Sequence, residues 1–317
     1  MNSLKQSFKS VLVENVTNSK NHTNSTNSTN QINPTNSTNQ INPTNSTDIT
    51  FDATNRDFAL WADFFYANGY IKIANAINSD QLMKLKADLY KLNNTIRQNA
   101  TKSTNRHFVH KRFFENSKTT VDLVESSVMT DFAKYLIADV PGGRGNTLSA
   151  HLIHNNAFTI NPGGRGQAPT YHTDDCLQNV IIPDGKKLPN WIRLPVLTAT
   201  WMCWLSDCNT SYNGPTYVVP GSHRWGRIVN QTEAEELGIP MCGMAGTAVL
   251  VNNQTWHRGC ENTSNIPRDT LQLTYARRII GHKFGTIMNY QMPPHVLAKK
   301  SMKTRELFGF LEGGAYS

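Results

Sequence analysis

The sequence predicts a mainly β protein with flanking helices, built on a double-stranded β-helix, the jelly-roll or cupin-like core. Two observations lead to this prediction. Helical patterns dominate the chain between Phe58 and Gly145, whereas short runs rich in β-branched and aromatic residues follow. Turn signals such as Pro162-Gly163-Gly164 and Asn213-Gly214-Pro215 separate these runs. Helices followed by many short strands are typical of a rolled sheet with helices on one outer face.

Residues 1–50 differ from the rest, and we expect them to form a low-complexity tail outside a folded domain of residues 51–317. Residues 15–50 consist almost entirely of Asn, Ser and Thr, and the run that begins at Asn33 starts again at Asn42. Such a tract buries too little apolar surface to offset its chain entropy. The tail is therefore expected to be disordered and to have no catalytic role.

The first half of the domain is expected to contribute most of the helices. Apolar residues recur at intervals of three and four over 58–66, and Asn68-Gly69 ends the pattern, which favours a helix stopped by glycine. Residues 70–73 then read as an edge strand. Asn78-Ser79-Asp80 supplies capping residues for a following amphipathic helix. The further helices are expected over residues 81–90 and 128–137.

The second half is expected to contribute the strands. These predicted strands are residues 148–160, 196–205, 216–219, 247–251 and 270–277. Trp201 and Trp204 lie three residues apart on one strand, so we expect their side chains to point to opposite faces. Core packing explains these tryptophans as well as substrate contact does.

Composition limits the classes of partner. The net charge is +8, and part of the excess lies in Lys111-Arg112, Arg277-Arg278 and Lys299-Lys300. We interpret these runs as a solvated basic face, although an anionic substrate would also suit the charge. The chain has no nucleic-acid-binding signature and no long apolar run, so neither nucleic acid nor a membrane is expected as a partner. Five cysteines without a CxxC pair, and no apolar run after the first lysines, favour reduced thiols and a cytoplasmic location.

The segment that indicates chemistry is Tyr171-His172-Thr173-Asp174, together with the distant His257. Two imidazoles and one carboxylate form the ligand set of non-haem iron(II) oxygenases. In an extended chain, residues i and i+2 project from the same side, so His172 and Asp174 can reach one ion. His257 must come from another strand, which a rolled sheet can bring alongside. A lone His-x-Asp arises readily by chance, and two structural histidines are the alternative interpretation.

Further motifs strengthen the first interpretation. Arg268 follows His257 by eleven residues at the start of a predicted strand, where its guanidinium could hold a carboxylate at two points. The sequence resembles the phytanoyl-CoA dioxygenase family over roughly residues 58–280. The matching segments are Phe65-Tyr66 with Gly69-Tyr70, His172-x-Asp174, Asn213 to Pro220-Gly221-Ser222-His223, and His257, Gly259, Asn262, Ser264 and Arg268.

The resemblance implies an iron(II) ion held by His172, Asp174 and His257. It also implies 2-oxoglutarate as cosubstrate, with its far carboxylate bound by Arg268, and hydroxylation of a small organic substrate by O2 with release of succinate and CO2. Many relatives have a helper serine where this chain has Gly259, so we expect Thr270 to supply the second anchor. Residues 177–195 are expected to form a lid over the site or a surface loop.

Two alternatives remain open on the same fold. A non-catalytic ligand-binding β-roll would need a broken ligand set or a missing arginine, and a halogenase normally lacks the carboxylate that Asp174 provides. Histidines outside the ligand set are expected to be structural, and these include His151, His154, His223 and His282. Neither the identity of the substrate nor the oligomeric state follows from the sequence.

Overall fold

The structure, a computed structural model, describes residues 49–99, 107–138, 150–166, 168–174, 181–183, 186–189, 191–284 and 289–310. Its helices are α1 (Phe58–Asn68), α2 (Ser79–Asn99), α3 (Lys118–Glu125), α4 (Val128–Ala138), α5 (Gln231–Leu237) and α6 (Met302–Leu307). Its strands are β1 (Thr50–Asp52), β2 (Tyr70–Ala74), β3 (His107–Lys111), β4 (Ala150–Ile160), β5 (Thr198–Trp204), β6 (Tyr217–Val218), β7 (Ile239–Pro240), β8 (Ala248–Asn252), β9 (His257–Arg258) and β10 (Arg268–Arg277).

Two β-sheets form the centre of the described part of the chain. The larger sheet has the strand order β1-β2-β8-β5-β10-β4-β3, and the smaller has the order β7-β6-β9. β10 lies between β4 and β5 and is antiparallel to both, with Thr270 opposite Phe158 on β4 and Trp204 on β5. This arrangement agrees with the predicted β core with flanking helices.

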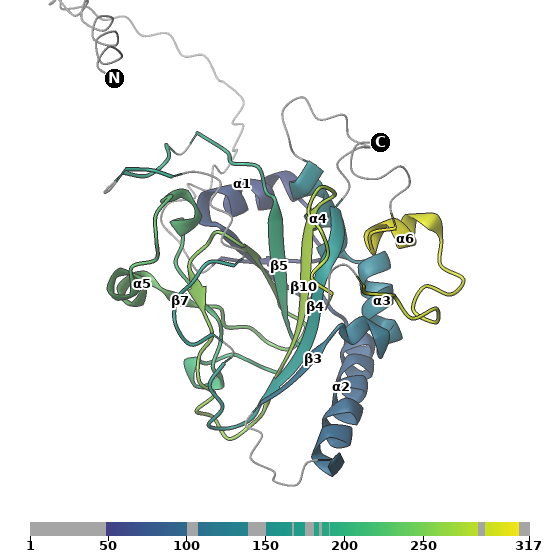
Figure 1. The fold of residues 1–317 in the computed structure, drawn as a ribbon. Helices are drawn as coiled ribbons and strands as arrows, with labels where there is room; N and C mark the ends of the chain where they lie inside the picture. Colours follow the sequence, from purple (N-terminus) through teal and green to yellow (C-terminus); the bar gives the residue numbers. More distant parts are fainter. Residues whose placement is uncertain are drawn as a thin grey trace, which may run out of the picture. The chain divides into compact units, whose positions relative to one another are not determined.

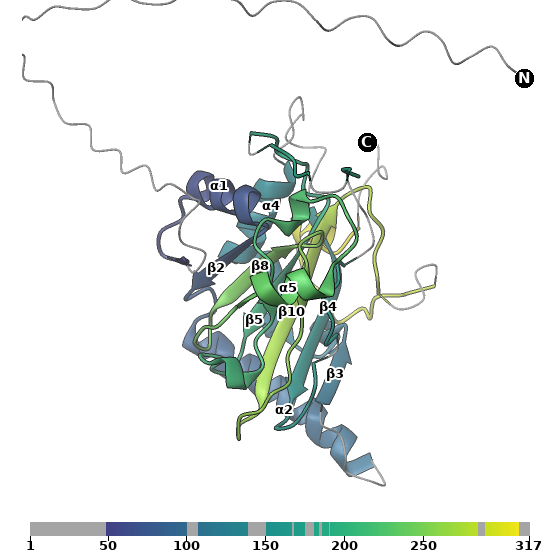
Figure 2. The same cartoon turned by 90° about the vertical axis from the view of Figure 1, so that its left-hand side faces the viewer.

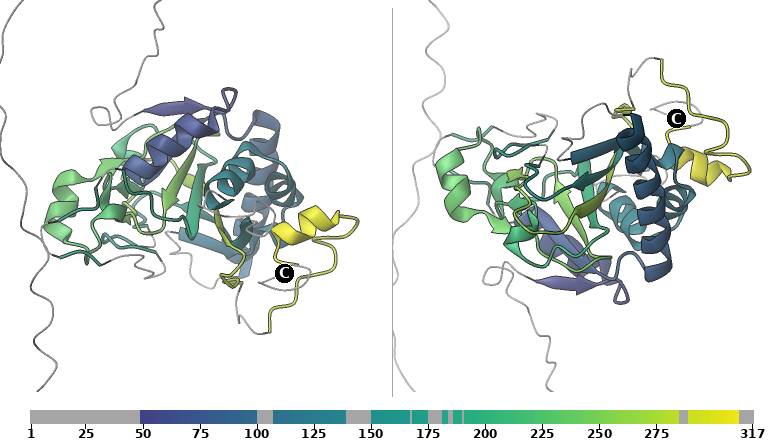
Figure 3. Two further views of the ribbon diagram at one scale, coloured as in Figure 1. Left: turned by 90° about the horizontal axis from the view of Figure 1, so that it is seen from above. Right: turned by 90° about the horizontal axis from the view of Figure 1, so that it is seen from below.

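Helices cover one face of the larger sheet, as predicted. In Figure 1, α2, α3, α4 and α6 lie on the side of the sheet away from β7, whereas α5 lies beside β7. Figure 2 shows α5 in front of β10, and Figure 3 shows the green α5 and the yellow α6 on opposite sides of the strands. α5 therefore departs from the predicted single helical layer. Among the described helices, none combines the length and the apolar character needed to cross a membrane.

The local signals at α1 and α2 work as the sequence suggests. Gly69 takes φ 77° after α1, and its N–H donates to the Phe65 carbonyl. Asn78 and Gln81 cap α2 reciprocally, because each side-chain oxygen accepts the other's backbone N–H at 3.0 and 3.1 Å. α2 continues to Asn99, well beyond the predicted end at residue 90. Its polar second half is fixed by tertiary contact, since the buried Asn93 donates to the Thr159 hydroxyl at 2.9 Å.

Trp201 and Trp204 point to opposite faces of β5, as expected, and both are fully buried. The Trp201 indole N–H donates to the Met129 carbonyl on α4, at 3.1 Å. The Trp204 indole N–H donates to the Met241 carbonyl at 3.1 Å. Both indole side chains are therefore packed in the protein core, with their N–H groups hydrogen-bonded.

The three basic runs form a solvated face only in part: Lys111 and Lys299 are exposed, but one member of each run is buried or ion-paired. Arg277 is buried and donates to the Val196 carbonyl at 3.2 Å. Lys300 lies 3.0 Å from the Asp122 carboxylate and also bonds Glu125. Arg112 lies 2.8 Å from the Glu115 carboxylate. The sequence does not reveal the partners of Arg277 and Lys300, because these partners are distant in the chain.

β2 was predicted as an edge strand, and this prediction is wrong. β1 pairs with it in parallel, with Thr50 opposite Lys72, and so covers its outer side. β1 begins inside the segment assigned to the tail. Ile49 and Phe51 pack against the main core, and the Phe51 and Phe64 ring centroids lie 5.4 Å apart. Residues 1–48 lie outside the described residues, so the disordered tail stays a prediction for them.

A pair of truncations separates the tail from β1. Removing residues 1–48 is expected to leave the melting temperature nearly unchanged, because a polar repeat makes no core. Removing residues 1–52 should cost about 2 kcal/mol of unfolding free energy, because the ring of Phe51 and the pairing of β1 with β2 are lost. Thermal unfolding of both proteins measures the difference. A large loss in the shorter truncation would show that the tail is docked on the domain.

Candidate metal centre

Two segments far apart in the sequence bring the predicted metal ligands together. His172 and Asp174 lie on the segment that follows β4, and His257 begins β9. His172 and His257 form an antiparallel bridge in which each backbone N–H donates to the other's carbonyl, at 2.9 and 3.0 Å. Backbone pairing thus fixes the relative position of the two imidazoles before any ion is bound.

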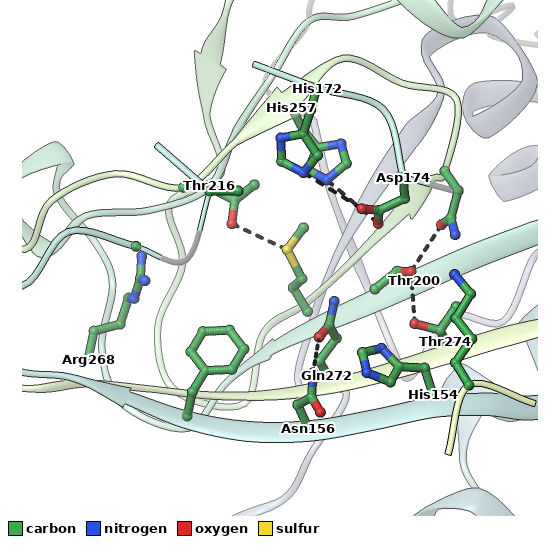
Figure 4. Close-up of a pocket in the computed structure, with 17 residues that line it drawn as sticks. His154, Asn156, His172, Asp174, Thr200, Thr216, His257, Arg268, Gln272 and Thr274 are labelled. Atoms are coloured by element: carbon green, nitrogen blue, oxygen red, sulfur yellow. Dashed lines mark hydrogen bonds and ion pairs between the residues drawn. The ribbon is translucent and has the colours of Figure 1, made fainter. Parts of the chain in front are cut away.

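The three side chains converge on one point, as Figure 4 shows. Nε2 of His172 lies 3.6 Å from Oδ1 of Asp174, and Nε2 of His257 lies 3.7 Å from Oδ2. One ligand atom from each of the three residues lies within 4.8 Å of the others. Two imidazoles and one carboxylate at such separations can hold one ion and leave further positions open for small molecules.

Backbone carbonyls set the tautomer of both histidines. Nδ1 of His172 lies 3.0 Å from the Thr170 carbonyl, and Nδ1 of His257 lies 2.8 Å from the Thr255 carbonyl. A carbonyl oxygen only accepts, so each Nδ1 carries the proton. The lone pair of each neutral ring is therefore on Nε2, the atom that faces Asp174. Partners of this kind orient metal-bound histidines and raise their basicity.

Electrostatics keep Asp174 and His257 in the protonation states that a metal requires. Burial acts to raise the pKa of Asp174, but the neighbouring His257 and His172 imidazoles outweigh it and lower the pKa to about 2. Burial lowers the pKa of His257, so this ring is neutral at physiological pH. The neighbouring Asp174 carboxylate raises the pKa of His172. An ionised carboxylate thus lies beside a neutral imidazole.

Arg268 begins β10 and points into the same cavity as the triad, with Thr216 between them (Figure 4). Its side chain is almost completely buried, at 3% exposure. Nε and Nη1 have no hydrogen-bond partner among the described residues, and burial lowers the guanidinium pKa. A buried cation with unpaired donors is costly. A carboxylate ligand would satisfy these donors, because a guanidinium fork can bind a carboxylate at two points.

The cavity that joins these groups has a volume of about 300 Å³. The sequence predicted four of its lining residues, namely the triad and Arg268. Thr270, the predicted second anchor, lies on the inward face of β10 and its buried hydroxyl has no partner among the described residues, but it does not line the cavity. The polar lining residues that sequence reasoning missed are His154, Asn156, Thr200, Thr216, Asn253, Gln272, Thr274 and Lys283.

A signal for some of these residues is present in the sequence. On the strand 268–277 Gln272 and Thr274 alternate with apolar residues, so the sequence places them on one face, although the same pattern also fits a face exposed to solvent. His154, which was expected to be structural, lines the cavity, and its role stays a prediction. His223 is structural as expected, since Nε2 of its buried ring lies 3.1 Å from the Tyr66 carbonyl.

The described parts of the segment 177–195 do not support its interpretation as a lid. Ile182 N–H donates to the Gly226 carbonyl at 3.0 Å, and Leu188 N–H donates to the Arg224 carbonyl at 3.2 Å. None of the described residues of this segment lines the cavity. This part of the segment therefore packs on the loop after β6. Cys176 and residues 177–180, 184, 185 and 190 lie outside the described residues.

Comparisons with known proteins agree with this geometry. The sequence profile of the phytanoyl-CoA dioxygenase (PhyH) family matches residues 65–270. Dioxygenase aneA of Aspergillus aculeatus is 29% identical over 146 residues, which are 46% of this chain and 46% of that protein. The chain thus spans about half the length of this relative. Multifunctional dioxygenase ausE of Emericella nidulans is 22% identical over 78% of this chain and 84% of that protein.

Among solved structures, HygX from Streptomyces hygroscopicus, with nickel, 2-oxoglutarate and hygromycin B bound, has a TM-score of 0.51 and 12% identity. The match covers 72% of this chain and 93% of that protein. At this identity the likeness shows a common fold. Together with the two sheets described above, it confirms the predicted double-stranded β-helix.

Proposed function

The chain belongs to the phytanoyl-CoA dioxygenase family and is by class an iron(II)- and 2-oxoglutarate-dependent dioxygenase, and we propose that His172, Asp174 and His257 hold its iron. The reaction proposed is hydroxylation of a small organic substrate by O2, with conversion of 2-oxoglutarate to succinate and CO2. Arg268 is proposed to bind the far carboxylate of 2-oxoglutarate, and Thr270 to assist as the second anchor.

One observation carries the proposal. A buried guanidinium with unpaired donors lies in the same cavity as two imidazoles and a carboxylate that converge on one point. A dicarboxylate that bridges Arg268 and a metal ion would satisfy both ends at once. A non-catalytic β-roll has no need of this pairing. A halogenase is disfavoured because Asp174 occupies the ligand position that chloride would require.

The chain's own residues contribute placement. When bound, iron and 2-oxoglutarate supply the oxidising chemistry with O2. His172 and His257 present fixed Nε2 lone pairs, because their Nδ1 atoms are held by backbone carbonyls. Arg268 would bind the far carboxylate of 2-oxoglutarate at one end of the cavity. Gln272 and Thr274 line the cavity farther from Arg268 and would be left for the substrate.

The test is a screen of candidate substrates with the purified, iron-loaded protein. We expect succinate to be released only when iron, O2 and 2-oxoglutarate are all present, with one hydroxylated product per succinate for a true substrate. A chlorinated product that requires chloride would support the halogenase instead. No conversion of 2-oxoglutarate, despite bound iron, would support the non-catalytic β-roll.

A further inference from the structure

The cavity wall changes in polarity along β10, starting from Arg268. Inward side chains alternate along a strand, so successive inward positions form rungs about 6.6 Å apart. The first rung above Arg268 is Thr270, which lies opposite Phe158 and Trp204. This rung is flanked by aromatic rings and lies beside the proposed cosubstrate anchor. At this level Phe158 lines the cavity whereas Thr270 and Trp204 do not, so the cavity wall next to Arg268 is apolar.

The next two rungs are polar and lie farther from Arg268 (Figure 4). Asn156 Nδ2 donates to Gln272 Oε1 at 3.1 Å, so the two side-chain amides form a hydrogen-bonded pair on the cavity wall. Oδ1 of Asn156 is buried and has no partner among the described residues. One rung higher, the Thr200 and Thr274 hydroxyls lie 3.0 Å apart, and the Thr200 hydroxyl donates to Asn253 Oδ1 at 3.0 Å. A ligand that contacts these amide and hydroxyl groups needs hydrogen-bonding groups of its own.

A positive charge lies near this end of the cavity. Lys283 is exposed and lines the cavity together with His154. Burial lowers the pKa of His154, and the charge of Lys283 lowers it further, which indicates that the two groups are close. The Lys283 backbone N–H donates to the Ile153 carbonyl at 2.7 Å, so the lysine is anchored to β4.

Given the proposed function, on which this inference rests, we propose that the substrate is a small polar carboxylate. Its carboxylate would bind Lys283, and its hydroxyl, amine or amide groups would bind Asn156 and the hydroxyls of Thr200 and Thr274. The cavity volume of about 300 Å³ is at the low end for ligand sites and is shared with the cosubstrate. A long acyl chain or a polycyclic hydrocarbon could not pair with the buried Oδ1 of Asn156.

Matched probes test this proposal by binding, without need of turnover. The iron-loaded protein with saturating 2-oxoglutarate, held anaerobically, is titrated with short-chain amino and hydroxy carboxylates and with the carboxamide of each. The thermal shift and the change in the visible band of the iron chelate report binding. We expect at least one carboxylate to bind at least tenfold more tightly than its carboxamide, because only the carboxylate can pair with a lysine.

Variants then show which residue causes the preference for a carboxylate over its carboxamide. Lys283→Met should reduce the carboxylate preference about tenfold and leave 2-oxoglutarate binding unchanged, while Lys283→Arg should retain the preference. Lys84→Met, at an exposed position on α2, is the matched control. Three outcomes overturn the proposal, provided that 2-oxoglutarate still binds. They are that no carboxylate binds, that carboxamides bind equally well, or that Lys283→Met keeps the full preference for carboxylates. If the parent protein itself fails to bind 2-oxoglutarate, the proposed function is refuted instead.

Discussion

Replacing Asp174 by glycine is expected to abolish hydroxylation and to weaken iron(II) binding. The carboxylate lies 3.6 Å from Nε2 of His172 and 3.7 Å from Nε2 of His257, so it is the charged member of the ligand set. Its pKa of about 2 keeps it ionised throughout the neutral range. Without it, two neutral imidazoles remain as protein ligands. Iron content after equilibrium dialysis and succinate release measure the two effects.

Neighbouring variants show whether the effect belongs to the ligand set. His172→Ala and His257→Ala should also lose iron, because each removes one Nε2 donor from the group. His107→Ala, at an exposed position on β3, should retain both the iron and the activity. If both ligand-position histidine variants keep stoichiometric iron, the metal assignment is wrong.

Replacing Arg268 by alanine is expected to weaken 2-oxoglutarate binding about thirtyfold or more and to leave iron in place. Loss of a buried charged partner costs roughly 2–5 kcal/mol, and 2 kcal/mol corresponds to about thirtyfold in affinity. Arg268 meets this description, because it is 3% exposed and two of its nitrogens have no partner among the described residues. Binding isotherms of the iron-loaded protein measure the change.

Two further arginine variants serve as controls for Arg268. Arg268→Lys should give an intermediate loss, because an ammonium keeps the charge but not the planar fork. Arg56→Ala removes a partly exposed arginine that pairs with Asp131 at 3.4 Å, and it should bind 2-oxoglutarate like the parent. An equal loss in both alanine variants would point to a general effect of lowered positive charge.

Much of the scaffold follows from local patterns. α1 and its glycine stop, the cap of α2 and the long strands β4, β5 and β10 are all set by periodicity and turn residues close in sequence. The metal ligands could be predicted because His172 and Asp174 share one side of an extended segment. His257 could be named only as a distant candidate until the resemblance to a family supported it, since no local pattern pairs it with His172.

The remaining features depend on long-range register. β1 is three residues long and adjoins a polar repeat, so no periodicity marks it, although its partner β2 then loses its place at the sheet edge. The substrate end of the cavity comes from positions that face each other only once β4, β5 and β10 are aligned, as for Asn156 and Gln272. Likewise, the partners of Lys300 on α3 are close in space but far in sequence.

An anaerobic titration of 2-oxoglutarate, followed by the visible charge-transfer band of the iron chelate, tests the central claim most directly. The claim is that His172, Asp174 and His257 hold iron while Arg268 holds the cosubstrate. We predict a saturable band in the parent protein, the same band at about thirtyfold or higher 2-oxoglutarate in Arg268→Ala, and no band in Asp174→Gly. The claim would be contradicted if the band of Arg268→Ala saturated at the same 2-oxoglutarate concentrations as in the parent, or if Asp174→Gly gave an unchanged band.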